Sequence, residues 1–320
     1  MKLFVFLHHF NSLFTQSSVT KYIRTFLKQA KRSDKYKRYT VMKYNFKNKT
    51  VIITGASAGV GAATARTFAQ LGANLVLVAR GQAALDVITA ELAEITSVIN
   101  IAMDINDASA NENLLVKAAQ TFGSVDVLIN NAGFHQRGDV TLNQASDLAK
   151  MVDVNLRAPI QLSCLMLPYL RKAGGGSIVN VGSLAGRTPL QGAATYAATK
   201  AGLRAFTYSL ADELQGTGIY VGVVSPGPID TGFIMSEIDQ VEDIVFSQPM
   251  STAQQVADAI VSVARGDKTE ISLPKISGWL TTISYLFPTL RKALRPALYR
   301  KGRKMKAQYK NRNLDSNNKL

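Results

Sequence analysis

The stretch 183-SLAGRTPLQGAATYAATK-200 places a hydroxyl, a phenol and an ammonium group where they could share a proton. Ser183 precedes Tyr196 by thirteen residues, and Lys200 follows the tyrosine by four. Residues at i and i+4 lie on one face of a helix, so the ammonium would lie near the phenol. A free phenol has a pKa of about 10, and a nearby positive charge favours its ionised form. By itself, the pattern also fits an ordinary helix start with a surface lysine.

A glycine-rich turn follows the first apolar run of the chain. In 54-TGASAGVGAATARTFAQLGA-73, Gly55, Gly59 and Gly61 stand between the β-branched segment 50–54 and an Ala-rich helical stretch. Glycine lets the backbone approach a pyrophosphate closely, and the exposed amides at a helix N-terminus attract its negative charge. This strand–turn–helix context makes the match informative, so the sequence predicts a dinucleotide site here.

The end of the second apolar run indicates which dinucleotide is bound. NAD-binding sites place an Asp or Glu about 20 residues after the glycines, where it binds the ribose 2′-hydroxyl. The segment 75-LVLVARG-81 has no acid there and offers Arg80 instead. A guanidinium can form paired hydrogen bonds with a 2′-phosphate, which favours NADP(H) over NAD(H). The alternative is a solvated loop arginine.

Short β-branched runs alternate with Ala- and Leu-rich helical stretches. Near-continuous apolar strands between helices are typical of a parallel sheet buried on both faces. The sequence therefore predicts one α/β domain over residues 42–273, doubly wound around about seven parallel strands. The expected strands are 50–54, 74–79, 98–102, 125–130, 177–181, 219–224 and a weaker 269–273.

Further motifs stand in a fixed order on these elements and resemble the short-chain dehydrogenase/reductase family. The resemblance covers about residues 45–273 and implies a Rossmann-type fold that interconverts a carbonyl and a secondary alcohol. The motifs that carry it, besides the glycine-rich turn, are 130-NNAG-133, Asn155 in 153-DVNL-156, Ser183, 196-YAATK-200 and 226-PG-227.

The resemblance assigns four catalytic residues. Tyr196 would be the general acid/base, and Lys200 would lower its pKa and bind the nicotinamide ribose. Ser183 would hold the substrate oxygen and stabilise the charge that develops on it. Asn155 would anchor a water that links Lys200 to solvent. Hydride passes directly between carbon atoms in such enzymes, so no metal is expected.

The resemblance also implies a set of cofactor contacts. Asp104 would bind the adenine, although it could equally cap the next helix. The expected cofactor-binding residues are Gly55, Ser57, Gly59, Val60, Gly61, Arg80, Asp104, Ile105, Asn131, Ala132, Gly133, Tyr196, Lys200, Pro226 and Thr231. Helices over 144–172 and 196–214 would form dimer or tetramer contacts, or would serve the core of a monomer.

Charge is distributed unevenly along the chain. The net charge is +15, but residues 42–264 carry −4, whereas residues 1–41 carry +8 and residues 265–320 carry +11. A mildly acidic core with basic ends argues against a nucleic-acid partner and indicates an anionic surface nearby, either lipid or polyanion.

The C-terminal tail, 274–320, has two interpretations. Fifteen uncharged residues separate Lys275 from Arg291, fewer than the ~20 needed to span a bilayer, and Pro288 interrupts them. Aromatic residues followed by clustered cations suit a segment that lies on a membrane surface. Alternatively, the apolar part closes the substrate pocket or docks on a partner subunit.

Three smaller features complete the expectations. The lid over 228–250 carries an apolar tip that includes Val245 and Phe246, which indicates either a lipophilic substrate or ordinary lid packing. Residues 1–41 are a basic extension, either a targeting or membrane-surface segment or an over-extended start before Met42. The single cysteine, Cys164, is expected to be a buried small hydrophobic residue.

The sequence thus predicts an intracellular, cytoplasmic NADP(H)-dependent reductase of a lipophilic ketone, peripheral to a membrane. One alternative is a soluble enzyme acting on small carbonyls or sugar alcohols. A second, from another class, is a nucleotide-binding regulator without turnover. The presence of all four catalytic residue types argues against the regulator.

Overall fold

A computed structural model describes residues 44–317, with side chains described as far as residue 312. The described residues belong to one compact unit. The expectations for residues 1–41 lie outside this range.

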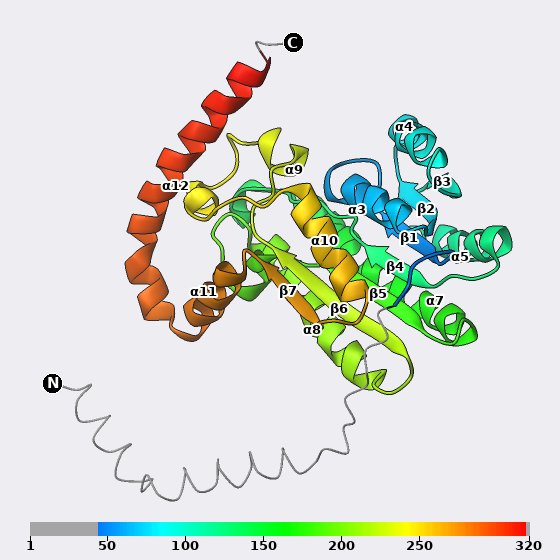
Figure 1. Ribbon diagram of the computed structural model, residues 1–320. Coiled ribbons are helices and arrows are strands. Elements are labelled where there is room, and N and C mark those ends of the chain that lie inside the picture. The colour runs from blue at the N-terminus through cyan, green and yellow to red at the C-terminus, as the bar shows by residue number, and fades with distance from the viewer. Residues whose placement is uncertain (1–43, 318–320) are drawn as a thin grey trace, which may run out of the picture. The chain divides into compact units, whose positions relative to one another are not determined.

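Seven parallel strands form one sheet in the order β3-β2-β1-β4-β5-β6-β7, as expected for a doubly wound α/β fold (Figure 1). β1 is central and pairs with β2 on one side and β4 on the other. The strand order reverses beside β1, and in such sheets ligands bind at the carboxyl edge near this point. The strands are β1 (Thr50–Thr54), β2 (Asn74–Ala79), β3 (Val98–Ala102), β4 (Val127–Asn130), β5 (Gly176–Val181), β6 (Ile219–Pro226) and β7 (Glu270–Leu273).

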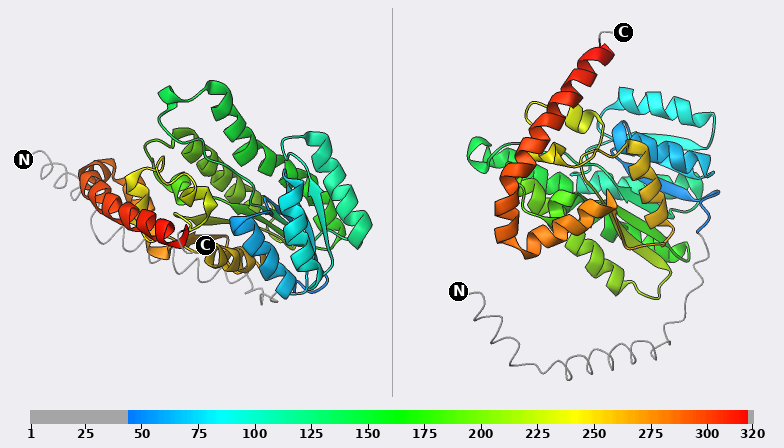
Figure 2. Two further views of the ribbon diagram at one scale, coloured as in Figure 1. Left: turned by 90° about the horizontal axis from the view of Figure 1, so that it is seen from above. Right: turned by 60° about the vertical axis from the view of Figure 1, so that its left-hand side comes forward.

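Helices cover both faces of the sheet, as Figure 2 shows from two further sides. One face carries α3 (Gly59–Gln70), α4 (Gln82–Ala93) and α10 (Ala253–Ala264). The other carries α5 (Ala108–Phe122), α7 (Ala158–Lys172) and α8 (Ala194–Glu213). A short α6 (Ala145–Val152) leads through a π-helical turn, Asp153–Arg157, into α7.

The strands are apolar throughout because successive side chains enter two different cores. Val51 and Ile53 of β1 pack with Phe68 of α3 on one face. Ile52, between them, packs with Leu162 of α7 on the other face. This alternation is what a strand buried on both sides requires.

Cys164 is exposed, so the expectation that it is buried was wrong. It lies on α7, whose sheet-facing side is formed by Leu162, Ser163, Met166 and Leu170. The apolar run around Cys164 did not reveal which side of the helix faces out.

The C-terminal segment folds onto the catalytic part of the chain as two helices. α11 (Lys275–Leu286) packs against β7 and the turn η3 (Leu184–Arg187). Pro288 then starts α12 (Pro288–Asn317), which packs along η4 (Asp243–Ser247). The contact is so close that a Cβ on Gly302 would lie 1.9 Å from the Asp243 carbonyl oxygen. Within the described range, no helix is long and apolar enough to cross a membrane.

The lid contains α9 (Gly232–Met235) and η4. Phe246, expected at its apolar tip, is buried with Val241 and Ile234 and packs against Met305 and Tyr309 of α12. This part of the lid therefore packs onto the protein itself.

Candidate active site

The turns after β1, β4, β5 and β6 meet at the carboxyl edge of the sheet and border a cavity of about 970 Å³. Most of the residues singled out from the sequence line it. They are Gly55, Gly59, Val60, Gly61, Asn131, Ala132, Gly133, Ser183, Tyr196, Lys200, Pro226 and Thr231. Five others do not: Ser57, Arg80, Asp104, Ile105 and Asn155.

The glycine-rich turn has the close approaches that a dinucleotide cradle requires. Gly55 has φ +65°, a conformation that side chains disfavour. A Cβ on Gly61 would lie 2.0 Å from the Gly55 carbonyl oxygen, so only glycine fits there. Asn131 fastens the turn, since its Nδ2 donates to the carbonyl oxygens of Thr54 at 2.9 Å and Gly55 at 3.1 Å.

The first turn of α3 offers unused backbone donors to the same space. Its N-cap residue, Ala58, has no side chain that could accept from the helix amides, and no acid occupies the first turn. Four amides at a helix start lack intrahelical partners, and together with the helix dipole they attract an anion. The glycine cradle and these amides therefore fit the pyrophosphate of a nicotinamide dinucleotide.

The residues expected at the adenosine end lie apart from the cavity. Arg80 is exposed directly after β2, and Ile105 is buried in the core. Asp104 is exposed and accepts a hydrogen bond from the Asn106 amide at 2.9 Å. The alternative that Asp104 caps the next helix was wrong, because Asp107 caps α5.

Lys200 and Tyr196 lie side by side on α8. The Lys200 Nζ atom is 5.9 Å from the centre of the Tyr196 ring and donates to the Val181 carbonyl oxygen at 2.8 Å. Lys200 is only 5% exposed, and burial lowers its pKa to about 8. Its ammonium group therefore loses its proton at mildly alkaline pH.

The pKa of Tyr196 differs from the expectation. Burial raises it above the ordinary value, although a hydrogen bond with Ser183 and the positive charge of Arg137 act in the opposite direction. The expected lowering by Lys200 was wrong for this structure, because the desolvation of the phenol outweighs the charges around it. Tyr196 therefore holds its proton at neutral pH.

Ser183 lies on the turn between β5 and η3, beside this pair. Its Oγ accepts from the Ala185 amide at 3.1 Å and donates to the Pro226 carbonyl oxygen at 3.4 Å. The second bond links the turn after β5 to the last residue of β6. The hydroxyl is thereby held at the cavity wall.

Asn155 lies in the π-helical turn, behind the cavity, and is fully buried. Its Nδ2 donates to the Phe134 carbonyl oxygen at 2.8 Å, and its Oδ1 accepts from the Phe134 amide at 3.0 Å. A Cβ on Gly133 would lie 2.9 Å from that Oδ1 and 3.5 Å from Lys200 Nζ. Asn155 thus fixes the loop after β4 next to Lys200; its anchoring of a water stays a prediction.

Sequence reasoning missed His135, whose ring stacks on Tyr196. The centroids are 4.2 Å apart and the planes differ by 17°. Burial and the charge of Arg137 lower the pKa of His135 to about 3, so the ring is neutral. Arg137 can only donate, so His135 Nδ1, 3.0 Å from its Nη1, must accept and Nε2 carries the proton. Only its place after 130-NNAG-133 could have drawn attention to it.

Arg137 connects the catalytic residues to the lid. Its Nε donates to Glu237 at 2.9 Å, and its Nη2 donates to the Phe233 carbonyl oxygen at 2.7 Å. The guanidinium therefore bridges the loop after β4, the neutral histidine and α9.

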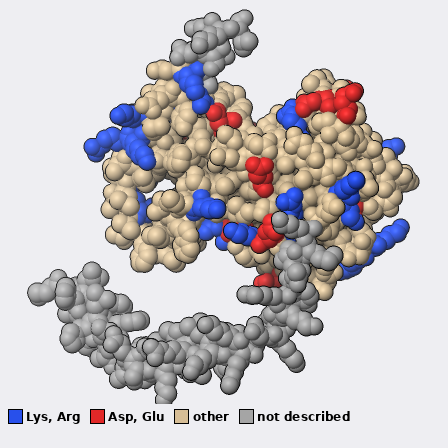
Figure 3. All heavy atoms as spheres, in the orientation of Figure 1, with Lys and Arg blue, Asp and Glu red and all other residues tan. Residues whose placement is uncertain are grey.

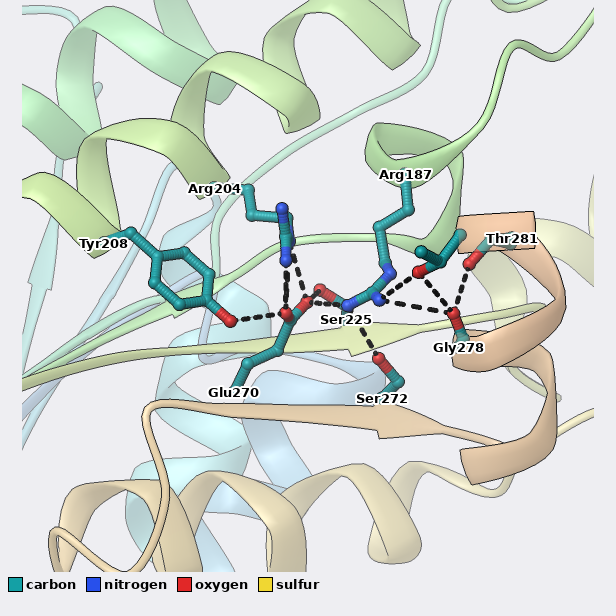
Figure 4. Close-up of polar contacts among 9 residues, drawn as sticks. Arg187, Arg204, Tyr208, Ser225, Glu270, Ser272, Gly278 and Thr281 are labelled. Atoms are coloured by element: carbon teal, nitrogen blue, oxygen red, sulfur yellow. Dashed lines mark hydrogen bonds and ion pairs between the residues drawn. The ribbon is translucent and has the colours of Figure 1, made fainter. Parts of the chain in front are cut away.

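An ion-pair cluster around Glu270 includes Arg187, the last residue of the η3 turn that starts after Ser183 (Figure 4). Glu270 of β7 accepts from Arg187 at 2.7 Å and from Arg204 at 2.8 Å. Arg187 also donates to the Gly278 carbonyl oxygen and to Thr282 of α11, at 3.2 and 2.9 Å. The cluster thus joins η3, β7, α8 and α11, and no sequence motif pointed to it.

The two C-terminal helices complete the cavity wall. α11 contributes Ser277, Leu280, Thr281 and Ser284, and the first half of α12 contributes further residues. This supports the interpretation of the tail as a segment that closes the pocket. Within the part of the chain that is described, no three His, Cys, Asp or Glu side chains gather as a metal site would require.

Comparison with known proteins agrees with this architecture. Residues 49–242 match the short chain dehydrogenase family, so the chain belongs to the short-chain dehydrogenase/reductase family. Ketoacyl reductase HetN of Nostoc sp. is 35% identical over 228 residues, which are 70% of this chain and 77% of that protein. The 3-oxoacyl-[acyl-carrier-protein] reductase FabG of Escherichia coli is 32% identical over 232 residues, 71% of this chain and 94% of FabG.

A solved structure of a metagenomic short-chain oxidoreductase in complex with NADP superimposes with a TM-score of 0.61 and 28% identity. The match covers 72% of this chain and 98% of that one. The chain is thus an NAD(P)-dependent oxidoreductase of the short-chain class.

Proposed function

We propose that the protein reduces a lipophilic ketone with NADPH as the hydride donor. The observation that carries this proposal is the convergence of Ser183, Tyr196 and Lys200 with the glycine cradle on one cavity. Relatives named as ketoacyl reductases support the direction of the reaction.

When bound, the nicotinamide supplies the hydride; this chain supplies the proton and the geometry. The glycine cradle and the start of α3 would hold the pyrophosphate, and Lys200 would donate to the nicotinamide ribose. The Ser183 hydroxyl would turn from the Pro226 carbonyl oxygen to donate to the substrate oxygen, which orients the carbonyl. Tyr196, which is protonated at neutral pH, would give its proton to that oxygen as negative charge develops there. Asn155 keeps the loop beside Lys200 in place.

Substitution of Tyr196 by Phe tests the catalytic assignment. The phenyl ring preserves packing but carries no proton, so turnover should fall by about 10²-fold or more across a ketone panel. Cofactor affinity should stay within about twofold, as measured by NADPH fluorescence titration. If the wild type binds NADPH and turns over no carbonyl in the panel, the non-catalytic regulator is the better interpretation.

NADP(H) preference is proposed from Arg80. No acid stands at the end of β2, and the Arg80 side chain is exposed there and available to a 2′-phosphate. Arg80→Ala should therefore lower the affinity for NADPH much more than the affinity for NADH. Equal losses of affinity for the two cofactors would show that Arg80 does not select NADPH.

A lipophilic substrate is proposed from the lining beyond the catalytic residues. Apolar side chains come from η3 and the following loop, from the lid and from the C-terminal helices; they are Leu184, Leu190, Phe233, Ile244, Val245, Leu280 and Leu298. kcat/KM should rise with chain length in a ketone series, because each buried methylene contributes about 0.8 kcal/mol. A preference for short carbonyls or sugar alcohols would instead favour the small-substrate alternative.

Peripheral membrane attachment inside the cell is proposed from α11, because this helix turns its polar side toward the protein and its apolar side outward. Its inward side is polar: Thr282 contacts Arg187, and Ser284 bonds Thr188 at 3.0 Å. Its outward side is apolar, with Trp279 75% exposed. Further exposed apolar residues continue across the bend into α12; they are Ile276, Ile283, Tyr285, Leu286, Phe287, Leu290 and Leu294.

Such a contiguous apolar face marks an interaction site, and the cations along α12 match it to anionic headgroups (Figure 3). Trp279→Ser with Phe287→Ser should reduce sedimentation with phosphatidylserine vesicles. Val87→Ser, at a comparably exposed position on α4, should not. Unchanged vesicle binding, with loss of a concentration-dependent dimer instead, would show that a second copy covers this face.

A homodimer or homotetramer through residues 144–172 and 196–214 also stays a proposal. These residues form α6, α7 and most of α8, on which Val152 and Cys164 are exposed. Sedimentation equilibrium measures the state directly. A monomer at micromolar concentration would contradict it.

A further inference from the structure

The cavity lining is electrostatically one-sided. Among the described residues that line it there are six Lys or Arg side chains and no Asp or Glu. Two of the cations, Arg137 and Lys200, belong to the catalytic end. The other four come from α12: Arg291, Lys292, Arg295 and Lys301.

These four cations lie away from the cofactor end of the cavity. α12 contacts the loop beside Thr231 of the cofactor pocket through Arg312, which pairs with Asp230 at 2.7 Å. A helix rises about 1.5 Å per residue, so Lys301 is about 16 Å from Arg312 along the axis and Arg291 about 32 Å. They therefore face the substrate part of the cavity.

The cations of α12 divide into three sets: those that line the cavity, those that pair with acids of the lid, and Arg300 and Lys304, which are exposed and do neither. In the second set, Arg303 and Lys306 pair with Asp243, and Lys310 pairs with Asp239.

The cavity-lining cations have no such role. Arg291, Lys292 and Lys301 make no ion pair with any described residue. Arg295 reaches an acid only indirectly, through Tyr299, whose hydroxyl donates to Glu242 at 3.2 Å. Lys292 and Arg295 also border a shallower neighbouring pocket with Glu242, whereas Arg291 and Lys301 line only the main cavity. The main cavity thus offers positive charge without an acid among its described lining residues, and an anionic ligand group would match it.

We propose that the substrate is an anionic amphiphile: a carbonyl at one end, an apolar chain, and a carboxylate or phosphate group at the other end that α12 binds. The inference rests on the proposed carbonyl reduction and names its substrate class. The C-terminal helix is then a specificity element, because it supplies the charge that selects the anionic end of the chain.

The test compares three ketones of equal chain length with NADPH in vesicle-free buffer: a medium-chain (ω−1)-oxo fatty acid, its methyl ester, and the matching oxo-alkyl phosphate. The wild type should show a lower KM for one or both anions than for the ester, and added KCl should raise the anion KM alone. The acid and phosphate arms distinguish the two headgroups.

Arg291→Gln with Lys292→Gln should raise the KM for the preferred anion about fivefold, the size expected for two partly screened charge contacts. Its kcat should stay nearly unchanged, because the contact is remote from the reacting atoms. The control, Arg300→Gln with Lys304→Gln, removes two exposed cations of the same helix that do not line the cavity. The control variant should leave the KM for each of the three ketones unchanged. Turnover of the methyl ester by both double variants would show that both fold.

Equal KM values for the ester and both anions in the wild type would overturn the inference while leaving the reductase intact. An equal effect of the two double variants on the anions would also overturn it, by showing that only overall charge matters. If the Arg291/Lys292 variant loses vesicle binding but keeps its anion KM, the cations serve the membrane. No turnover of any ketone would instead refute the proposed function.

Discussion

Glu270 is the residue on which the walls of the active site depend most, and its removal has a predictable cost. Four side chains donate to its carboxylate from three elements, at 2.7–2.8 Å for the shortest contact of each. Burial alone would raise the pKa of Glu270, but hydrogen bonds from Arg204, Arg187, Ser225 and Tyr208 outweigh it and lower the pKa from 4.5 to about 2.

The free energy of unfolding follows from this shift. A pKa lowered from 4.5 to about 2 corresponds to at most about 3 kcal/mol of stability, because solvent screens the partly exposed Arg204 side of the cluster. Because the folded-state pKa is depressed, the contribution is complete above the unfolded pKa of 4.5 and is lost as the pH falls toward 2. At pH 3.5 roughly 2 kcal/mol should remain.

The perturbation is Glu270→Gln, measured by urea denaturation. At pH 7 the variant should lose about 2–3 kcal/mol, since Arg187 and Arg204, whose side chains are 15% and 33% exposed, lose their countercharge. The difference from the wild type should narrow as the pH is lowered below 4.5. A control is Glu91→Gln, which breaks an exposed pair with Arg66 and should cost about 0.5 kcal/mol or less. If the two variants lose equal stability at pH 7, the cluster does not have the assigned energy.

Three further predictions concern the site itself. Gly61→Ala should weaken NADPH binding by about tenfold or more, because the new Cβ would collide with the Gly55 carbonyl oxygen. The control is Gly81→Ala, which has open space around it and should leave NADPH affinity unchanged in the same titration. His135→Ala should lower kcat by a few-fold, because the Tyr196 ring loses its stacking partner and an aromatic pair contributes about 0.5–1.5 kcal/mol. His135→Phe should keep the wild-type kcat. Equal kcat values for the two variants would contradict this role of the ring. The KM for NADPH should rise as the pH passes the Lys200 pKa of about 8, because the ammonium that binds the ribose is lost, and a flat profile from pH 7 to 9 would refute that contact.

The fold and the cavity-lining motifs could be predicted because each depends on local sequence. A glycine-rich turn between a strand and a helix has few structural uses, and Gly61 shows why a side chain is excluded. Tyr196 and Lys200 are brought together by helix geometry alone. The seven expected strands are present within a few residues of their expected bounds.

What could not be predicted depends on contacts between segments far apart in the chain. Glu270 and Arg187 are 83 positions apart, and neither belongs to a motif. The direction of the Tyr196 pKa shift could not be predicted either, because burial, the hydrogen bond with Ser183 and the charge of Arg137 act in opposite directions and only the packed site fixes their balance. The prediction that Cys164 is buried was wrong for a related reason, because an apolar run does not indicate which side of a helix faces the sheet.

The C-terminal helices are more than an appendage to the family fold, because the same arginine holds them and the catalytic turn. Arg187 lies four residues after Ser183 and contacts both buried Glu270 and the start of α11. A displacement of α11 would therefore act on η3 through the Arg187 side chain, and the Ser183 hydroxyl sits at the start of that turn. The C-terminal helices and the turn that carries Ser183 are therefore fastened by one side chain, so α11 is part of the scaffold of the catalytic turn.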